Sequence, residues 1–519
     1  MDNPLAGALI TPRPSADETG SWPRAESATP TARRRRSFAP SVPDLIGASV
    51  LAGVLLGKRP EVLNGDTAAH LRMGELILDS GSIPRTETLS FTMLGRHLAL
   101  PGWLGEVAFA AAERLGGLGM VAALAAGLAV LAAVLPALLL RRRGADPRIT
   151  LLAVALGASL SASGWTARPH LWSYVGVGLV LGMLERRRPV PLAGVALLFA
   201  AWANLHAGFV YGLALLGLYA LGTWVEERGA EYPRGGAGGG ARRLLAATAV
   251  ACAASLLNPA GPGIVRQIAG ALGSDAVAAQ TTEWAPPSFG EPRGVFLAAV
   301  VLAAAAVVLL SRRRPAWSRA LAVAAFLLAA LQSSRHVPLF GLVAVPLVAL
   351  HASESFRRTS TRYWFGDAFA EIERRTVPGA WILPLFLGFA WLSARPGAWG
   401  FDPSQYPVAA VQAARSAGLQ GRIFHSLQWG GFIAYAWPER KVFFHPVKYD
   451  DDVSAAYLGV VAGPSPPAAR LEQLGIDLVV AEPGSRLARE LVAAPGWTVW
   501  HRDGTAVVLR RSTGPRLPP

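Results

Sequence analysis

An acidic residue and a histidine stand one helical turn apart in the stretch Asn64–Arg72, directly after the first apolar run of the chain. Asn64 can cap a helix over about Gly65–Leu78, which places Asp66 in the first turn, where backbone N–H groups and the helix dipole favour its ionised form. His70 follows one turn later on the same face. A carboxylate and an imidazole at this spacing can bind a divalent metal or take up a proton. The same pattern also fits an amphipathic surface helix without a chemical role.

The elements that must position these residues are long apolar blocks separated by short polar segments. With 52% hydrophobic and only 16% charged residues among 519, the chain is apolar for a soluble protein of its length. The blocks predict an α-helical polytopic membrane protein with about 11 transmembrane helices, some of which must extend into their polar flanks. The predicted spans are Val42–Leu56, Leu118–Leu140, Thr150–Gly164, Leu171–Leu184, Val190–Ala203, Phe209–Val225, Leu244–Leu257, Gly294–Leu310, Trp317–Leu331, Val337–Leu350 and Val377–Leu392.

Arginine clusters such as Arg141–Arg143 and Arg186–Arg188 end every second block, and the positive-inside rule places them in the cytoplasm. These clusters account for the net charge of +15, so no nucleic-acid partner is expected. We expect a multi-pass protein of the plasma (inner) membrane, with a cytoplasmic N-terminus and an extracytoplasmic C-terminal region. A crossing by Trp103–Leu115 would break this alternation. We therefore predict a surface or re-entrant helix there.

Composition divides the chain into three predicted parts. These are a disordered cytoplasmic tail (1–40), a transmembrane part (41–396) with its first extracytoplasmic loop at 58–117, and an extracytoplasmic α/β domain (397–519). The tail is rich in Pro, Ser, Thr and Arg, whereas short strands and helices alternate in the last part. Strands are predicted at Arg422–His425, Lys441–Phe444, Asp477–Val480, Trp497–Trp500 and Thr505–Leu509, and helices at Gln405–Ala417, Val453–Val461, Ala468–Leu474 and Ser485–Ala493.

Under this topology the unusual polar residues gather at the extracytoplasmic ends of the spans, while the opposite ends carry mostly arginine. Singly, each residue fits a helix cap or an interfacial anchor. Jointly, acidic and basic side chains at one membrane boundary predict a cavity, because such groups are costly there unless they face water or one another. The set comprises Asp66, His70, Arg72, Trp103, Glu106, Arg168, His170, Asn204, His206, Asn258, Glu283, Trp284, Arg335 and His336.

This arrangement resembles the GT-C superfamily of integral-membrane glycosyltransferases, which includes protein O-mannosyltransferases, aminoarabinose transferases and oligosaccharyltransferases. The resemblance rests on a first outside loop with an acidic residue and surface helices, followed by many spans and an outside α/β domain. It covers Val42 to about Leu392 as architecture, with Gly65-Asp66-x-x-x-His70 as the local motif. Many members carry paired acids at this place, whereas here Gly65 precedes a single Asp66.

The resemblance implies a polyprenyl-phosphate-linked sugar donor and transfer to a glycan, lipid or protein acceptor on the extracytoplasmic face. It implies Asp66 as the first-loop acid and, by position, Glu283 as a second catalytic acid. Arg168, His170, His206, Arg335 and His336 are the predicted substrate-binding residues. Asp66 and His70 are the predicted ligands of a divalent metal, Mg²⁺, Mn²⁺ or Zn²⁺.

The implied reaction is a displacement at the anomeric carbon of the sugar. Asp66 would act as the general base on an acceptor hydroxyl or amine, and a metal or arginine would stabilise the departing lipid phosphate. Three other hypotheses remain: a transporter or flippase, a non-catalytic scaffold, and a ligase or polymerase of lipid-linked glycans. Transporters favour polar or broken helices near the membrane midplane, whereas the mid-span residues here are Ala, Leu, Val and Gly.

Overall fold

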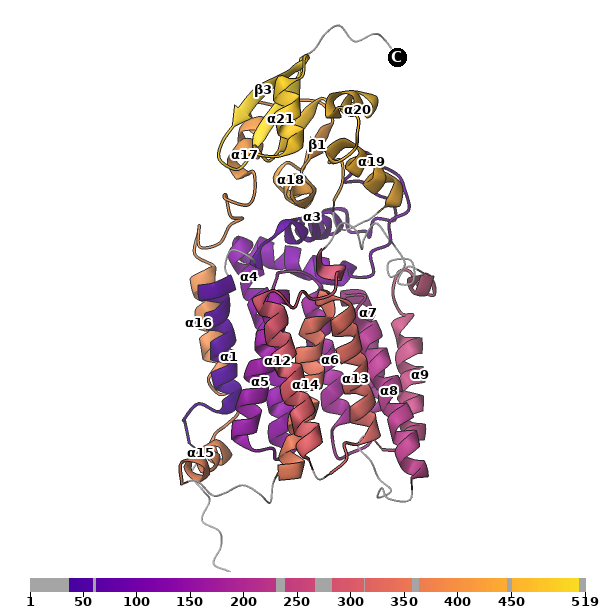
Figure 1. Cartoon of the computed structure of the whole chain (residues 1–519), viewed down its shortest axis with the longest axis vertical. Helices are drawn as coiled ribbons and strands as arrows, with labels where there is room; N and C mark the ends of the chain where they lie inside the picture. The colour runs from indigo at the N-terminus through magenta and orange to yellow at the C-terminus, as the bar shows by residue number, and fades with distance from the viewer. Residues whose placement is uncertain are drawn as a thin grey trace, which may run out of the picture.

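The computed structural model describes residues 37–58, 62–229, 239–266, 282–311, 313–356, 364–445 and 450–512. Its helices stand side by side in a bundle, and the C-terminal residues form a separate unit at one end of that bundle (Figure 1). We call residues 401–512 the C-terminal unit. The predicted tail, residues 1–40, lies outside the described residues except for its last four, so its disorder stays a prediction.

Each predicted span overlaps a helix of the bundle. Four helical segments are long and apolar enough to cross a membrane, namely α4, α8, α12 and Ser334–Ser355, while other apolar helices of the described residues are shorter. The number of crossings therefore stays a prediction. The helices are α1 (Val42–Gly53, extended by η1, Val54–Lys58), α4 (Trp103–Arg142), α5 (Pro147–Ser161), α6 (His170–Leu184), α7 (Leu192–Leu205), α8 (Phe209–Arg228), α9 (Ala241–Ser255), α12 (Pro292–Leu310), α13 (Trp317–Gln332), α14 (Val337–Phe356) and α16 (Ile382–Ser393).

Helix α4 contains a sharp break between a surface segment and the segment that runs through the bundle. Gly116 and Gly117 have non-helical dihedral angles, and Gly117 has a φ of 64°, which glycine adopts without steric cost. The segment before the break lies against α3 (Gly65–Ser80), which crosses the end of the bundle beneath the C-terminal unit (Figure 1). The two helices approach so closely that a Cβ at Gly74 would lie 2.3 Å from the Glu106 carbonyl oxygen.

The C-terminal unit holds a small mixed sheet with the strand order β1-β2-β4-β3. Strands β1 and β2 are parallel, and β4 pairs antiparallel with both β2 and β3. Buried aromatic and aliphatic side chains, including Phe424 and Val479, form its core. Its elements are α17 (Val408–Ser416), β1 (Ile423–His425), η5 (Leu427–Trp429), α18 (Gly430–Ala436), α19 (Asp451–Val461), α20 (Pro467–Gln473), β2 (Leu478–Ala481), α21 (Arg486–Ala493), β3 (Trp497–Arg502) and β4 (Val507–Arg511).

One local prediction for this unit is wrong. Lys441–Phe444 is not a regular strand, because only Val442 pairs, through isolated bridges to Ile423 on one side and Ser90 on the other. Gly430 and Gly431 lie after β1 and begin helix α18. Glycine is required there because a Cβ at either position would lie 2.1 Å from a backbone carbonyl oxygen.

The segment between α3 and α4 is joined to the C-terminal unit. Ser90 pairs with Val442, and its hydroxyl donates to the Phe443 carbonyl at 2.8 Å. Glu87 and His445 form an ion pair of 3.0 Å between two side chains that are both fully buried. This pairing and the backbone N–H groups of Leu89 and Ser90 hold the pKa of Glu87 below its usual value, against the opposing effect of burial. The first loop and the C-terminal unit therefore pack as one body over the bundle.

Candidate functional site

The N-terminus of α3 is built as the sequence predicts. The Asn64 side-chain oxygen accepts from the Thr67 N–H at 2.9 Å, and the Thr67 hydroxyl receives the Asn64 N–H at 3.3 Å. These reciprocal contacts form a capping box that fixes the first helical turn. The Gly65 N–H donates to the Tyr406 hydroxyl of the C-terminal unit at 2.8 Å. Asp66 is therefore positioned by residues from two distant parts of the chain.

One guanidinium brings together the two predicted catalytic acids. Arg168, in the segment before α6, forms ion pairs with Asp66 through one terminal nitrogen and with Glu283 through the other, the latter at 2.9 Å. Glu283 lies in the short helix η3 (Thr282–Trp284) that precedes α12. Burial by itself lowers the pKa of Arg168, but the two carboxylates raise it above its usual value, so the guanidinium stays charged.

A cavity of about 760 Å³ opens beside this ion pair. Its wall is polar near Arg168 and apolar toward α12 and α14, where Phe296, Leu297 and Leu339 line it. The polar wall consists mainly of Ser159, Ser163, Arg168, His170, Ser173, Tyr174, His206, Tyr211, Glu283, Ser288, Glu291, Arg293, Ser334 and Arg335. An apolar wall that meets a cluster of charges can accept a ligand with both a lipid chain and an ionic group.

Two of the predicted histidines meet across this cavity. The ring centroids of His170 and His206 lie 6.5 Å apart, and His170 also packs edge-on against Tyr174 at 5.2 Å. The His206 Nδ1 contacts the Ser173 hydroxyl at 2.7 Å, and the Trp202 indole N–H donates to that hydroxyl at 2.9 Å.

The other predicted substrate-binding residues flank the same cavity. Arg335 lines the cavity wall, and its guanidinium carbon lies 5.1 Å from the Trp284 ring centroid. No carboxylate of the described ranges forms an ion pair with Arg335. Its charge is therefore available to an anion. His336 is not among the lining residues, but its Nε2 contacts the hydroxyl of Tyr211, which does line the cavity, at 3.1 Å.

His70 does not share a contact with Asp66, although the two residues lie one turn apart. Its Nδ1 lies 3.1 Å from the Glu106 carboxylate, while Asp66 pairs with Arg168. A carboxylate on one ring nitrogen is the usual arrangement of a histidine that binds metal through the other. However, no three His, Cys, Asp or Glu side chains gather as a metal-binding group within the described part of the chain. The residues present therefore fit a divalent metal only in part.

Sequence reasoning missed several residues of this site. Ser173 and Tyr174 follow His170 by three and four positions, so helical spacing could have placed them on the same face. Tyr211 lies in the first turn of α8, shortly after His206. Tyr406 comes from the C-terminal unit, and no local pattern connects it to Gly65.

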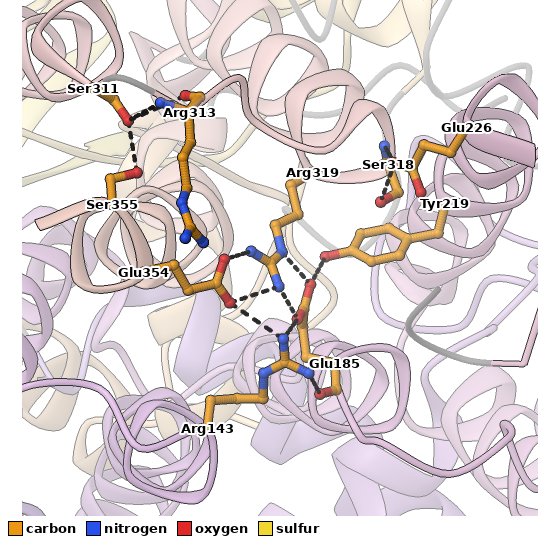
Figure 2. A network of polar contacts seen from close by, with 10 residues as sticks. All are labelled: Arg143, Glu185, Tyr219, Glu226, Ser311, Arg313, Ser318, Arg319, Glu354 and Ser355. Atoms are coloured by element: carbon orange, nitrogen blue, oxygen red, sulfur yellow. Dashed lines mark hydrogen bonds and ion pairs between the residues drawn. The ribbon is translucent and has the colours of Figure 1, made fainter. Parts of the chain in front are cut away.

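At the opposite end of the bundle, carboxylates form ion pairs with arginines. Glu185, fully buried at the end of α6, binds Arg319 of α13 through both carboxylate oxygens at 2.9 Å (Figure 2). Glu354 of α14 also pairs with Arg319, at 2.8 Å, and with Arg143 at 3.3 Å. The predicted arginines are present, and those enclosed between tightly packed helices have carboxylate partners that the sequence analysis did not anticipate.

Comparison with known proteins identifies the fold. No protein-family model matches the sequence, and no curated protein matches it either. Two structures of the oligosaccharyltransferase of Archaeoglobus fulgidus do match. The one tethered to an acceptor peptide with the NVT sequon is 15% identical, with a TM-score of 0.53 over 85% of this chain and 68% of that one. The complex of AglB with an inhibitory peptide and a dolichol-phosphate is 13% identical, with a TM-score of 0.52 over 92% and 74%.

A third match is the arabinofuranosyltransferase AftD from Mycobacteria, which is 16% identical with a TM-score of 0.52. The alignment covers 92% of this chain but only 42% of the longer AftD chain. At such identities the matches establish the fold. The chain has the GT-C glycosyltransferase fold, and the resemblance inferred from the sequence is confirmed at that level.

Proposed function

We propose that this protein is a membrane glycosyltransferase that moves a sugar from a polyprenyl-phosphate donor to an acceptor on the extracytoplasmic face. The observation that carries the proposal is the pairing of Asp66 and Glu283 on one guanidinium beside a cavity that is polar at one wall and apolar at the other. A lipid-linked sugar phosphate likewise has an apolar chain and a polar head group. The matched AglB structure contains a dolichol-phosphate, which is a ligand of this chemistry.

The topology is part of the same proposal. Helix α6 begins at His170, beside the cavity, and ends next to Glu185, in the ion-pair network at the other end of the bundle. The C-terminal unit lies at the α3 end of the bundle (Figure 1), where Tyr406 contacts Gly65 next to Asp66. We therefore assign the cavity and the C-terminal unit to the extracytoplasmic side, and the arginine-rich end to the cytoplasm.

The proposed mechanism assigns separate tasks to the charged groups. Asp66, ionised beside Arg168, accepts the proton of the acceptor hydroxyl or amine as this group attacks the anomeric carbon. The bond from that carbon to the phosphate oxygen breaks, and the electron pair leaves with the lipid phosphate. Arg335, which has no carboxylate partner in the described ranges, stabilises the phosphate. Arg168 holds Asp66 and Glu283 in place during the reaction.

A divalent metal at Asp66 and His70 is proposed separately, and no step above depends on it. When bound, such a metal would supply Lewis-acid stabilisation of the leaving phosphate. His70 is oriented by Glu106 for this role, but Asp66 would have to bind the metal while it contacts Arg168.

A turnover assay on the purified protein tests the proposal. The substrates are polyprenyl-monophosphate sugars, and the variants are Asp66→Asn and Glu283→Gln. We expect wild type to transfer or hydrolyse the sugar and both variants to lose about 100-fold or more of the rate. Asp79→Asn is the matched control, because Asp79 lies at the other end of α3 and pairs with the exposed Arg114. Equal turnover in wild type, Asp66→Asn and Glu283→Gln would refute the catalytic assignment, and transport without bond cleavage would favour a flippase.

A further inference from the structure

The hydrogen-bond partners of His206 fix which of its nitrogens carries a proton. The Trp202 indole can only donate, and it donates to the Ser173 hydroxyl, so the serine proton is free to point at His206 Nδ1. The Gly208 N–H donates to the same Nδ1 at 3.0 Å. Two donors on one ring nitrogen require that nitrogen to be unprotonated. The ring is therefore held neutral, with its proton on Nε2.

The contacts of His170 also fix its protonated nitrogen, but they leave the acceptor nitrogen, and not the donor, open. Its Nε2 lies 2.7 Å from the Gly164 carbonyl oxygen, which can only accept, so Nε2 carries the proton. In the neutral ring Nδ1 then has a lone pair and acts as an acceptor. Arg168 and Arg335 line the same cavity wall and disfavour a second proton on this ring.

Both rings line the cavity, and each has one nitrogen left for a ligand. Neither Nε2 of His206 nor Nδ1 of His170 has a hydrogen-bond partner among the residues described. The wall thus offers one N–H donor and one lone-pair acceptor on rings whose centroids are 6.5 Å apart. A hydroxyl group, or two neighbouring hydroxyls, can accept from the first and donate to the second.

We propose that His170 and His206 form a subsite that recognises a hydroxyl of the transferred sugar and selects a neutral, hydroxylated sugar over an amino sugar or a uronic acid. The proposal rests on the glycosyltransferase function given above and adds the class of sugar. An ammonium group can donate to His170 Nδ1, but it meets the N–H of His206 and is repelled by Arg168 and Arg335. A carboxylate can accept from His206 but would face the lone pair of His170, and in the proposed mechanism Arg335 is occupied by the donor phosphate. The negative charge of Glu283 is already paired with Arg168.

Donor binding tests this subsite without the need for an acceptor. The probes are short-chain polyprenyl-monophosphate donors that carry a neutral hexose, each of its monodeoxy analogues, an aminodeoxy hexose or a hexuronic acid. Affinity for the purified protein is measured by calorimetry in detergent. We expect the neutral hexose to bind best and one monodeoxy analogue to bind about tenfold more weakly. The amino sugar and the uronic acid should lose at least as much affinity.

Variants then connect the lost hydroxyl to the histidines. His206→Leu should weaken binding of the neutral hexose about tenfold but leave the sensitive monodeoxy analogue unchanged, because that analogue lacks the contact. His206→Gln retains an N–H donor and should restore much of the affinity. The control is His501→Leu, since His501 lies in the C-terminal unit, remote from the cavity, and pairs with Asp503.

The outcomes separate the two proposals. Three results would each overturn the histidine subsite. They are equal affinity of wild type for all monodeoxy analogues, a further loss of affinity for the sensitive monodeoxy analogue in His206→Leu, and a preference of wild type for the amino sugar. The monodeoxy series on wild type gives this answer even if His206→Leu does not fold. Binding with the expected pattern but without sugar transfer would instead overturn the glycosyltransferase function and leave the subsite standing.

Discussion

At the scale of single residues, Arg168 is the group on which the site depends. It is the side chain that contacts both predicted acids, and it is mostly buried. Without Arg168, the two carboxylates would face each other beside a cavity. Their mutual repulsion would then disfavour both their present positions and their ionised forms. Asp66 and Glu283 lie far apart in the sequence, and their common ion pairs with Arg168 bring them into one site.

Replacement of this arginine gives the first prediction. Arg168→Gln should lower kcat/KM for sugar transfer roughly 100-fold or more, because the acids lose their common anchor and the phosphate loses a nearby charge. For Arg168→Lys, kcat/KM should lie between the values of wild type and Arg168→Gln, since an ammonium cannot bind two carboxylates in the forked geometry of a guanidinium. Arg114→Gln is the control, because Arg114 also joins two carboxylates, Glu75 and Asp79, on the exposed side of α3. Unchanged kcat/KM in Arg168→Gln would show that the site lies elsewhere.

Metal dependence is a second prediction at this scale. If Asp66 and His70 bind a divalent ion, chelation should abolish turnover, and Mg²⁺, Mn²⁺ or Zn²⁺ should restore it. His70→Ala should then raise the metal concentration needed for half-maximal activity about 10- to 100-fold. Full turnover after exhaustive chelation, with no metal detected in the protein by mass spectrometry, would remove the metal from the proposal.

At the scale of elements, the contact between α18 and the N-terminus of α3 transmits the position of the C-terminal unit to Asp66. A Cβ at Gly431 would lie 2.1 Å from the Gly65 carbonyl oxygen, and Gly65 directly precedes Asp66. Gly431→Ala should therefore lower both turnover and the melting temperature, with a cost in stability of about 1–3 kcal/mol. Gly459→Ala, in α19 where an added Cβ meets nothing within 4 Å, should be neutral or stabilising. Similar losses in both variants would argue against a specific contact.

Strand β1 carries a histidine that makes the C-terminal unit sensitive to acid. His425 is fully buried, donates from Nδ1 to the Ser426 carbonyl at 3.0 Å and accepts from the Phe444 N–H at 3.4 Å through Nε2. Burial lowers its pKa to about 4. Because the unfolded chain takes up this proton near pH 6.5, stability should fall as the pH drops from about 6.5 to 4, by roughly 3 kcal/mol in total, and level off below.

Hydrogen exchange of the strands β1 and β2 as a function of pH measures this effect. In His425→Gln the loss of protection between pH 6.5 and 4 should be much smaller, whereas in His501→Gln it should match wild type, since His501 is partly exposed. A wild type whose strand protection stays constant over this range would contradict the assignment of His425 as the acid-sensitive group.

Periodicity and spacing predicted the elements better than the contacts between them. The eleven apolar blocks each overlap a helix, and the Asn64 cap and a break between Trp103–Leu115 and the next apolar block are present, because these features depend on local sequence. The pairing of Ser90 with Val442 and the hydrogen bond between Gly65 and Tyr406 span more than 300 residues, and no local pattern encodes them. The same holds for the carboxylates that neutralise Arg319.

At the scale of the whole molecule, the two ends of the bundle have different tasks. The end near Asp66 leaves guanidinium and imidazole groups open to a cavity, as binding requires. At the other end, polar groups are satisfied by one another: the Tyr219 hydroxyl donates to Glu185 at 2.8 Å, and Glu226 accepts from both the backbone N–H and the hydroxyl of Ser318. This network joins α6, α8, α13 and α14, and we expect its contribution to be to stability (Figure 2).

This division predicts that stability and turnover can be changed separately. Glu185→Gln leaves the buried Arg319 with Glu354 as its remaining carboxylate partner in the described ranges, and should cost about 3–5 kcal/mol, seen as a lower melting temperature in detergent. Below that temperature kcat/KM should stay near the wild-type value, because the cavity lies at the other end of α6 and α14. Glu371→Gln is the control, since Glu371 pairs with arginines on an exposed face of α15 (Trp364–Arg375) and its loss should cost under 1 kcal/mol. A Glu185→Gln protein that melts like wild type but no longer turns over would show instead that the network is coupled to the cavity through these helices.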